Sequence, residues 1–254
     1  MKAFFVKSKS IIITFLLYII VWYSAAAASG NSLIIPYPSS VINDFFSFFL
    51  KKSFYLSVLF TLTRFFAAFA FSLFLGVLLP ILSISSKRFS NIIKPGILSL
   101  RSIPVISMIL ISLIWFSTDC ASIFIGITVM LPIIYINVFD GLSDVKKDYL
   151  EFAKVFKISR IKTFRYIYFP SGIEFLFSSM SNAAGIGIKS VIAAEVIAKP
   201  ILGIGSNMHS AQSYLKISEL FAWTMTAVIL ALIIEYSIRL TEKRLIKWSF
   251  DDKT

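Results

Sequence analysis

The chain has 254 residues, of which 57% are hydrophobic, and its mean hydropathy is +0.85. This composition is too apolar for a soluble domain of that length, and it predicts an integral membrane protein with one membrane domain over residues 1–254. The net charge of +12 does not by itself indicate nucleic acid, and a single Cys120 and a single His209 exclude an internal disulfide and a His/Cys zinc cluster.

The first apolar run covers residues 11–28 and follows a basic segment at the N-terminus. It ends in four alanines, as a cleavable signal peptide would. Its length, however, approaches the ~20 residues that a spanning helix needs, and Trp22 and Tyr23 occupy positions typical of an interfacial belt. We therefore favour an uncleaved first span over a signal peptide.

Five further apolar runs follow, and residues 41–50 predict a short amphipathic helix between the first span and the second. The predicted fold is all-α, an integral membrane protein with about six transmembrane helices. In chain order, the predicted spans cover residues 11–28, 54–82, 99–116, 121–139, 173–197 and 220–240. A basic loop precedes the third span, and Pro104 would bend that span or mark its start.

Lys and Arg residues are distributed unevenly among these segments. Nineteen of the 25 lie in the two termini, in the loops after the second and fourth spans, or at the span ends next to them, as Arg101 and Arg239 do. Four lie in the other connections, and Arg64 and Lys189 lie inside spans away from their ends. Cytoplasmic loops carry an excess of Lys and Arg. The pattern predicts a multi-pass protein of the cell (plasma or inner) membrane with both termini cytoplasmic. Anionic lipid and a protein partner then account for the charge without nucleic acid.

Residues 144–170 form a basic, amphipathic insert between the fourth and fifth spans. The apolar residues that recur there at helical spacing, and so predict one face of a helix, are Tyr149, Phe152, Ala153 and Phe156. Glu151 lies on the opposite face, and Ser159 can cap a second short helix. Such a helix-turn-helix either lies on lipid headgroups or docks on a protein, and its residues alone leave both open.

This insert resembles the cytoplasmic EAA loop of the permeases of binding-protein-dependent ABC importers, whose pattern is E-A-A, three residues, G, nine residues and I-x-L-P. The residues on that spacing are Glu151, Ala153, Ile167 and Pro170, with Phe152 at the second position. Lys157 stands where the family has Gly, which would supply a left-handed turn at no steric cost. Either Lys157 bears a strain of about 1 kcal/mol or the turn differs locally.

Further segments strengthen the resemblance: "LRSIP" at 100–104, "AAEVI" at 193–197, and "LGIG" to "LFAW" at 202–223. Together they are similar to the nitrate/sulfonate/taurine-like branch of the MetI-like permeases. The resemblance implies ATP-driven alternating access for a small anionic, sulfonate-, nitrate-, taurine- or thiamine-precursor-like solute. It also implies three kinds of protein partner: two ABC ATPase subunits, an extracytoplasmic substrate-binding protein and a second permease copy in a homodimer. The residues that it assigns to ATPase coupling are Tyr149, Glu151, Phe152, Ala153, Phe156, Lys157, Ser159, Ile167 and Pro170.

Ionisable residues within the predicted spans are candidates for the translocation path, because charge inside a membrane is costly and usually functional. The candidates are Arg64, Lys189, Ser190 and Glu195. Lys189 would attract an anion. Lys189 and Glu195 are about 120° apart on one helix, so they should not pair. The structural alternatives are that Glu195 bonds backbone or hydroxyl groups near the outer end of its helix and that Lys189 snorkels or pairs with another helix.

No catalytic constellation appears in the sequence: there is no Walker A loop, HExxH, GxSxG or carboxylate pair. We expect no catalytic residue, no metal and no cofactor in this chain, with ATP hydrolysis on a separate subunit. The alternative function is a stand-alone secondary transporter or channel, which would need inverted repeats that residues 11–116 and 121–240 do not display. A membrane scaffold without transport is a third class.

Overall fold

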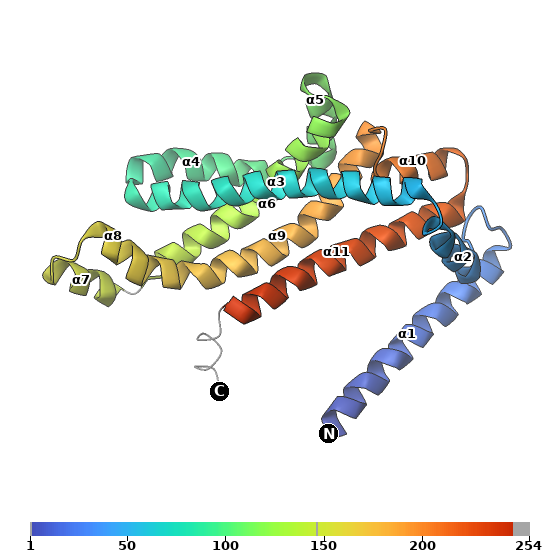
Figure 1. The fold of residues 1–254 in the computed structure, drawn as a ribbon, viewed down its shortest axis with the longest axis horizontal. Helices are drawn as coiled ribbons and strands as arrows, with labels where there is room; N and C mark the ends of the chain where they lie inside the picture. The colour runs from blue at the N-terminus through green and yellow to red at the C-terminus, as the bar shows by residue number, and fades with distance from the viewer. Residues whose placement is uncertain (1, 146, 246–254) are drawn as a thin grey trace.

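The structure is a computed structural model that describes residues 2–145 and 147–245, a part of the chain that forms helices without any strand (Figure 1). Residue 146 of the predicted loop and residues 1 and 246–254 lie outside the described part. The helices are α1 (Lys2–Ser29), α2 (Pro38–Phe48), α3 (Lys52–Ser85), α4 (Lys87–Leu100), α5 (Val105–Trp115), α6 (Thr118–Ser143), α7 (Lys147–Val155), α8 (Arg160–Thr163), the π-helix η1 (Phe164–Tyr168), α9 (Phe169–Ala198), α10 (Ile204–Ser213) and α11 (Ile217–Leu245).

Within the described residues, four helices are long and apolar enough to cross a membrane. They are Lys52–Ser85, Thr118–Ser143, Gly172–Ala198 and Ile217–Glu242, and they contain the predicted second, fourth, fifth and sixth spans. The central helix α6 packs against both α3 and α9, and α9 packs against α11. Small residues permit this close packing: a Cβ on Gly76 would lie 2.6 Å from the Ile134 side chain, and one on Gly126 would lie 2.7 Å from Ala68.

The region of the predicted third span differs from the prediction. The helix within residues 99–116 covers only Val105–Trp115, and Pro104 is its N-cap residue. The predicted basic loop before it is the helix α4, which meets α5 at a bend of 103°. The physical reason is that Ile93, Ile97 and Leu100 recur at helical spacing and pack against α3 and α6. Counted as one span, the bent pair brings the number of candidate spans in the described residues to five.

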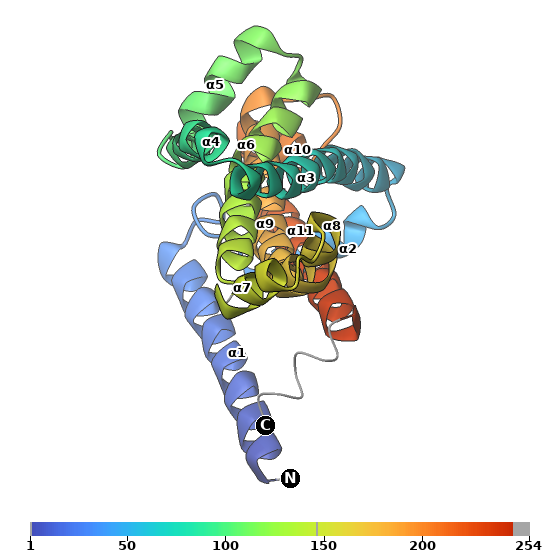
Figure 2. The same cartoon turned by 90° about the vertical axis from the view of Figure 1, so that its left-hand side faces the viewer.

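The N-terminal helices lie at the edge of this bundle. Helix α1 extends away from the other helices, as Figures 1 and 2 show from two directions. Its part from Leu16 to Ser29 is apolar. Helix α2 packs on α11, where the Phe48 and Trp223 rings stack with centroids 4.6 Å apart.

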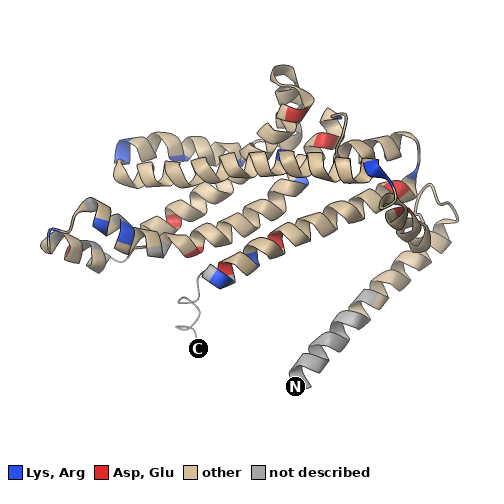
Figure 3. Cartoon of the chain, viewed as in Figure 1, with Lys and Arg blue, Asp and Glu red and all other residues tan. Residues whose placement is uncertain are grey.

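The two ends of the bundle differ in charge. Lys and Arg gather where α7 and α8 lie and at the start of α4, which we call the α7 end (Figure 3). The opposite end carries α10 and the start of α3, and we call it the α10 end. The predicted coupling residues lie at the α7 end, and Arg64 and Glu195 lie at the α10 end.

Candidate functional site

The central insert folds as a helix-turn-helix at the α7 end, where α7 and α8 are joined by a tight turn. Lys157 in that turn has a φ of +48°, and the Ile158 N–H donates to the Ala153 carbonyl at 2.9 Å. This is the left-handed helix end that normally uses glycine. Of the two alternatives that the sequence left open, Lys157 therefore adopts the strained conformation. The Ser159 hydroxyl accepts from the Lys162 N–H at 3.5 Å, in the capping position that the sequence predicts.

The apolar side chains of α7 are mostly uncovered. Tyr149, Phe152 and Phe156 are 55%, 55% and 64% exposed, and we call these three residues the aromatic face of α7. The Phe152 and Phe156 rings contact each other with centroids 4.4 Å apart. Of the predicted apolar positions, only Ala153 is buried within the chain. An exposed aromatic patch on a short helix is typical of a surface that binds a partner.

The other predicted coupling residues surround this face. Glu151 is exposed, Ile167 is half-buried in η1, and Pro170 is the second residue of α9. The π-helix η1 joins α8 directly to α9 without an intervening loop. The helix-turn-helix is therefore connected to α9, one of the central helices, through continuous helical backbone.

A different arrangement surrounds Arg64 and Glu195 at the α10 end. Glu195 in α9 is fully buried and Arg64 in α3 is 4% exposed. The Arg64 Nη1 donates to Glu195 Oε1 at 2.5 Å, and its Nε donates to Asp119 Oδ1 at 2.7 Å. The guanidinium also donates to the Leu202 carbonyl at 2.7 Å. We call Arg64, Asp119 and Glu195 the ion cluster, and it joins α3, α6 and α9.

Neutral donors complete the surroundings of Glu195. Its Oε2 accepts from the Thr61 hydroxyl at 2.9 Å and from the Gly205 N–H at 3.0 Å. Two glycines allow the chain before α10 to approach so closely. A Cβ on Gly203 would lie 2.7 Å from Glu195 Oε2, and one on Gly205 would lie 2.3 Å from the Ile192 carbonyl. The carboxylate is thus bonded to backbone and hydroxyl groups near the end of its helix, and also to an arginine that the sequence analysis did not pair with it.

Lys189 lies on another face of α9. With Ser178 and Asn182 it forms an exposed row, which we call the polar face of α9. This face lines a cavity of about 560 Å³ between α9 and α11, whose far side carries the Arg239–Glu235 ion pair at 2.7 Å. Within the described residues, no ion pair or hydrogen bond involves the Lys189 ammonium.

The four predicted path residues are thus not gathered in one place. Arg64 and Glu195 form a buried pair, Lys189 faces the open side of α9, and the Ser190 hydroxyl donates to the Ile186 carbonyl of its own helix at 3.0 Å. The sequence analysis missed Asp119. The available signal was that a buried arginine requires carboxylates, and Asp119 begins the neighbouring span at the same membrane face.

The arrangement can do two things chemically. The described residues contain no group of three or more His, Cys, Asp or Glu side chains that could hold a metal ion. They do offer the exposed Lys189 cation beside polar amide and hydroxyl groups, and the exposed aromatic face of α7. Those features suit the binding of an anion and of a protein, respectively.

Comparison with known proteins gives a consistent result. Residues 68–246 match the sequence family described as "Binding-protein-dependent transport system inner membrane component". The nitrate import permease protein of Synechocystis is 27% identical over 235 residues, which are 88% of this chain and 84% of that protein. The taurine transport system permease protein of Escherichia coli is 23% identical over 242 residues, 90% and 85% of the two chains. The bicarbonate transport system permease protein of Synechococcus elongatus is 27% identical over 201 residues, 78% and 69%.

Two solved structures share the fold. One is the crystal structure of an amino acid ABC transporter with histidines, with a TM-score of 0.63 and 17% identity over 74% of this chain and 92% of that one. The other is the MetNI methionine ABC transporter in inward-facing conformations, with a TM-score of 0.52 and 17% identity over 76% and 92%. At this identity the two structures support the helical arrangement alone.

Proposed function

This chain belongs to the family of binding-protein-dependent transport system inner membrane components, and from that premise we propose how it works as the permease subunit of an ABC importer. Its relatives are named for nitrate, taurine and bicarbonate transport. We propose that this chain carries a small solute of the nitrate, sulfonate or taurine kind. The transport mechanism is alternating access between two conformations of the transporter. Nucleotide can shift the balance between these conformations only because it binds one of them more tightly than the other.

The observation that carries the proposal is the aromatic face of α7. Three aromatic side chains are more than half exposed, two on the nine-residue helix α7 and Phe156 directly after it, beside the exposed Glu151. We propose that a separate ABC ATPase subunit covers this face and hydrolyses the ATP, one ATPase for each of two permease copies. Because α8 continues through η1 into α9, we expect a movement of the ATPase to be transmitted through these helices to the centre of the bundle.

The charge distribution supports an orientation. Because basic residues gather at the α7 end, we propose that this end and both termini face the cytoplasm (Figure 3). The α10 end would then face the extracytoplasmic side, where a substrate-binding protein docks. With α1 as a first span and the bent pair α4–α5 as another, the proposed membrane domain has six spans in total.

The polar face of α9 supports a translocation path. Its exposed row of Ser178, Asn182 and Lys189 lies on a helix that is otherwise packed against α3, α6 and α11. A charged row facing lipid would be costly, so we propose that a second copy of the chain closes it off from lipid and leaves a polar channel. The Ser190 hydroxyl, bonded to its own helix, contributes to packing in this proposal.

The ion cluster has a separate role in the proposal. Arg64 and Glu195 join α3, α9 and the start of α10 through buried bonds, so these parts should move as one rigid unit at the extracytoplasmic side. We propose that the unit positions the outer gate and does not contact the solute.

Purification from native membrane followed by reconstitution tests the function. We expect an ATPase to accompany the chain, and solute uptake into vesicles to require ATP on the ATPase side together with the binding protein. The variant Glu151→Ala should lower the stimulated ATP hydrolysis without reducing insertion. Uptake by the chain alone, without nucleotide or companion, would instead indicate a stand-alone transporter or channel.

A further inference from the structure

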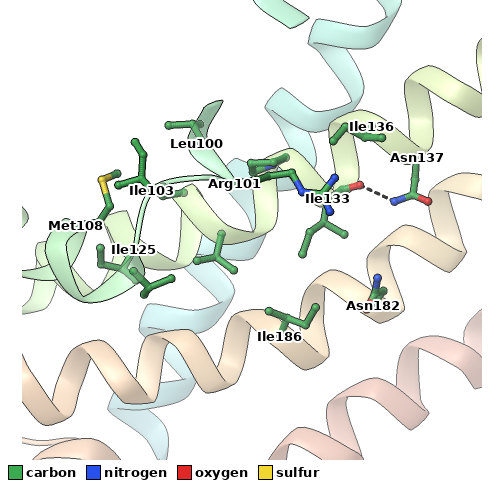
Figure 4. A pocket seen from close by; sticks show the side chains of 14 residues that line it. Leu100, Arg101, Ile103, Met108, Ile125, Ile133, Ile136, Asn137, Asn182 and Ile186 are labelled. Carbon is green, nitrogen blue, oxygen red and sulfur yellow. Dashed lines mark hydrogen bonds between the residues drawn. The ribbon is translucent and has the colours of Figure 1, made fainter. Parts of the chain in front are cut away.

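A second cavity, of about 290 Å³, lies where α4 turns into α5. Its walls come from the turn at residues 101–104, from α6 between Ile125 and Asn137, and from α9 at Asn182 and Ile186. Figure 4 shows the Arg101 side chain extending from the turn along α6 toward Ile133 and Asn137, with Asn182 and Ile186 on the opposite wall. None of these residues belongs to the coupling surface or the ion cluster.

The depth of this cavity makes Arg101 unusual. Helix α6 runs from residue 118 to 143 and α9 from 169 to 198, so the lining residues 125–137 and 182–186 are central in both helices. The Arg101 side chain is exposed, and it lies beside the second half of α6 and across the cavity from the middle of α9. A cation at that depth costs about 2.5–3.5 kcal/mol on insertion scales and is usually retained for a function.

Arg101 also has no acid to balance it inside the described part of the chain. The ion pairs found there involve Arg64, Lys216 and Arg239, and none involves Arg101. This contrasts with Arg64, the other arginine at span depth, which has two carboxylates within 2.7 Å.

The remaining lining of the cavity has two parts. Amide groups flank the guanidinium: Asn137 uses one amide hydrogen on the Ile133 carbonyl at 2.7 Å and keeps a second, and Asn182 is exposed with no hydrogen bond of its side chain within the described residues. The other part is apolar and includes Ile103, Val105 and Met108. A site with a cation and amides at one end and aliphatic groups at the other matches a ligand with the same two parts.

We infer that this cavity is a solute-binding site within the permease, in which Arg101 binds the anionic group of a small organic anion and the apolar wall holds a short alkyl chain. Asn137 and Asn182 position the anionic group beside the guanidinium. The inference rests on the proposed transport function and selects among its solutes, because an alkanesulfonate has an alkyl part to bury and an inorganic oxyanion such as nitrate has none.

The position of the cavity along the proposed path supports this assignment. Asn182 and Ile186 line both this cavity and the one that contains Lys189. Two cations, Arg101 and Lys189, therefore lie on either side of the same two residues of α9. An anion that leaves one cation would meet the Asn182 amide before it reaches the other.

A binding experiment tests the inference on the full chain in lipid nanodiscs, with any accompanying ATPase and without the binding protein. The probes are radiolabelled butanesulfonate, with ethanesulfonate, nitrate and butyltrimethylammonium as competitors. We expect saturable binding of butanesulfonate, and an affinity that rises about threefold to fourfold for each methylene between ethanesulfonate and butanesulfonate. Neither butyltrimethylammonium nor nitrate should compete at the same concentration. Arg101→Gln should weaken binding tenfold or more, and Asn182→Ala severalfold. Asn182 is exposed, so its variant keeps the test valid if Arg101→Gln fails to fold.

Arg88→Gln is the matched control, since Arg88 is an exposed arginine of α4 that does not line the cavity, and it should bind like the wild type. The inference is overturned if butanesulfonate does not bind, if nitrate competes equally, or if Arg101→Gln binds unchanged. It is also overturned if Arg101→Gln separates two copies of the chain without changing binding, because Arg101 would then pair across an interface. If no ATPase accompanies the chain, the proposed function is contradicted. The binding measurements still test the cavity, because they do not require the ATPase.

Discussion

The ion cluster at the α10 end and the aromatic face at the α7 end are organised in opposite ways. Every oxygen of the Glu195 carboxylate has a donor from the same chain, and the side chain is completely buried. The three residues of the aromatic face are more than half exposed, and the Phe152 and Phe156 rings contact each other. The bonds of the first region lie within the chain and should contribute to its folding, whereas the second region is the surface that we propose the ATPase covers.

The largest effect should come from removing the acid of the ion cluster. Glu195→Ala leaves the buried Arg64 with the exposed Asp119 and removes the acceptor of Thr61 and Gly205. Breaking a buried ion pair costs about 3–5 kcal/mol, a large part of the stability of a typical domain. Denaturant unfolding in detergent and the yield of folded protein measure this loss.

Two controls make that result specific. Replacing both buried partners, Arg64→Met with Glu195→Met, should recover part of the lost stability, because an apolar pair avoids an unpaired buried charge. Asp119→Ala should cost less than Glu195→Ala, since Asp119 is 57% exposed and can be replaced by water. A Glu195→Ala protein as stable as the wild type would show that the cluster does not hold the helices together.

The second effect should appear in binding and leave folding unchanged. Truncation of Phe152 and Phe156 to Ala removes two exposed rings, so the free energy of unfolding should change by less than about 0.5 kcal/mol. Association with the ATPase should weaken about tenfold or more, as expected for aromatic anchors of an interface. Affinity measurements on the purified subunits, together with stimulated ATP hydrolysis, test this directly.

Phe46→Ala is the matched control for that experiment. Phe46 is 63% exposed, close to the 64% of Phe156, but it belongs to α2 at the other end of the bundle. It should leave ATPase association unchanged. If Phe46→Ala weakens ATPase association as much as the α7 substitutions do, the loss reflects a general effect of exposed rings on lipid contact or solubility and not docking of the ATPase.

An intermediate case is the polar face of α9, which has a charge but no partner within the described chain. Lys189→Gln should lower uptake of an anionic solute about tenfold, since one favourable charge contact is worth about 1.4 kcal/mol, and should leave the folded yield unchanged. Ser190→Ala, next to it, should change uptake by less than about twofold because the hydroxyl is bonded to its own helix. Vesicle uptake and folded yield, measured on the same preparations, separate the two outcomes. Equal losses of uptake and yield for Lys189→Gln would favour a structural lysine.

These regions also show which features the sequence could predict. Long apolar runs placed the helices α3, α6, α9 and α11, because length and hydropathy are properties of the segment itself. The left-handed conformation of Lys157 was one of two predicted alternatives, because it depends on local turn geometry. The partner of Arg64 could not be identified in this way, since Glu195 is 131 residues away and their contact depends on how α3 and α9 pack. Pro104 was predicted to bend the third span or mark its start, and it is the N-cap of α5, but the helix α4 was predicted as a basic loop because its packing on α3 and α6 depends on the fold.

The smallest effect should come from the turn that holds the aromatic face in place. Lys157 has a φ of +48°, which costs an ordinary residue about 1–2 kcal/mol and glycine almost nothing. Glycine loses more entropy on folding, by about 0.5–1 kcal/mol, so Lys157→Gly should stabilise the turn by less than about 1 kcal/mol. The Ile158 amide, which donates across this turn to Ala153, should then exchange with solvent about threefold to fivefold more slowly. Lys157→Ala removes the same side chain but keeps the strain, so its exchange rate should stay near that of the wild type. Slower exchange in both variants would mean that the lysine side chain, and not the backbone conformation, destabilises the turn.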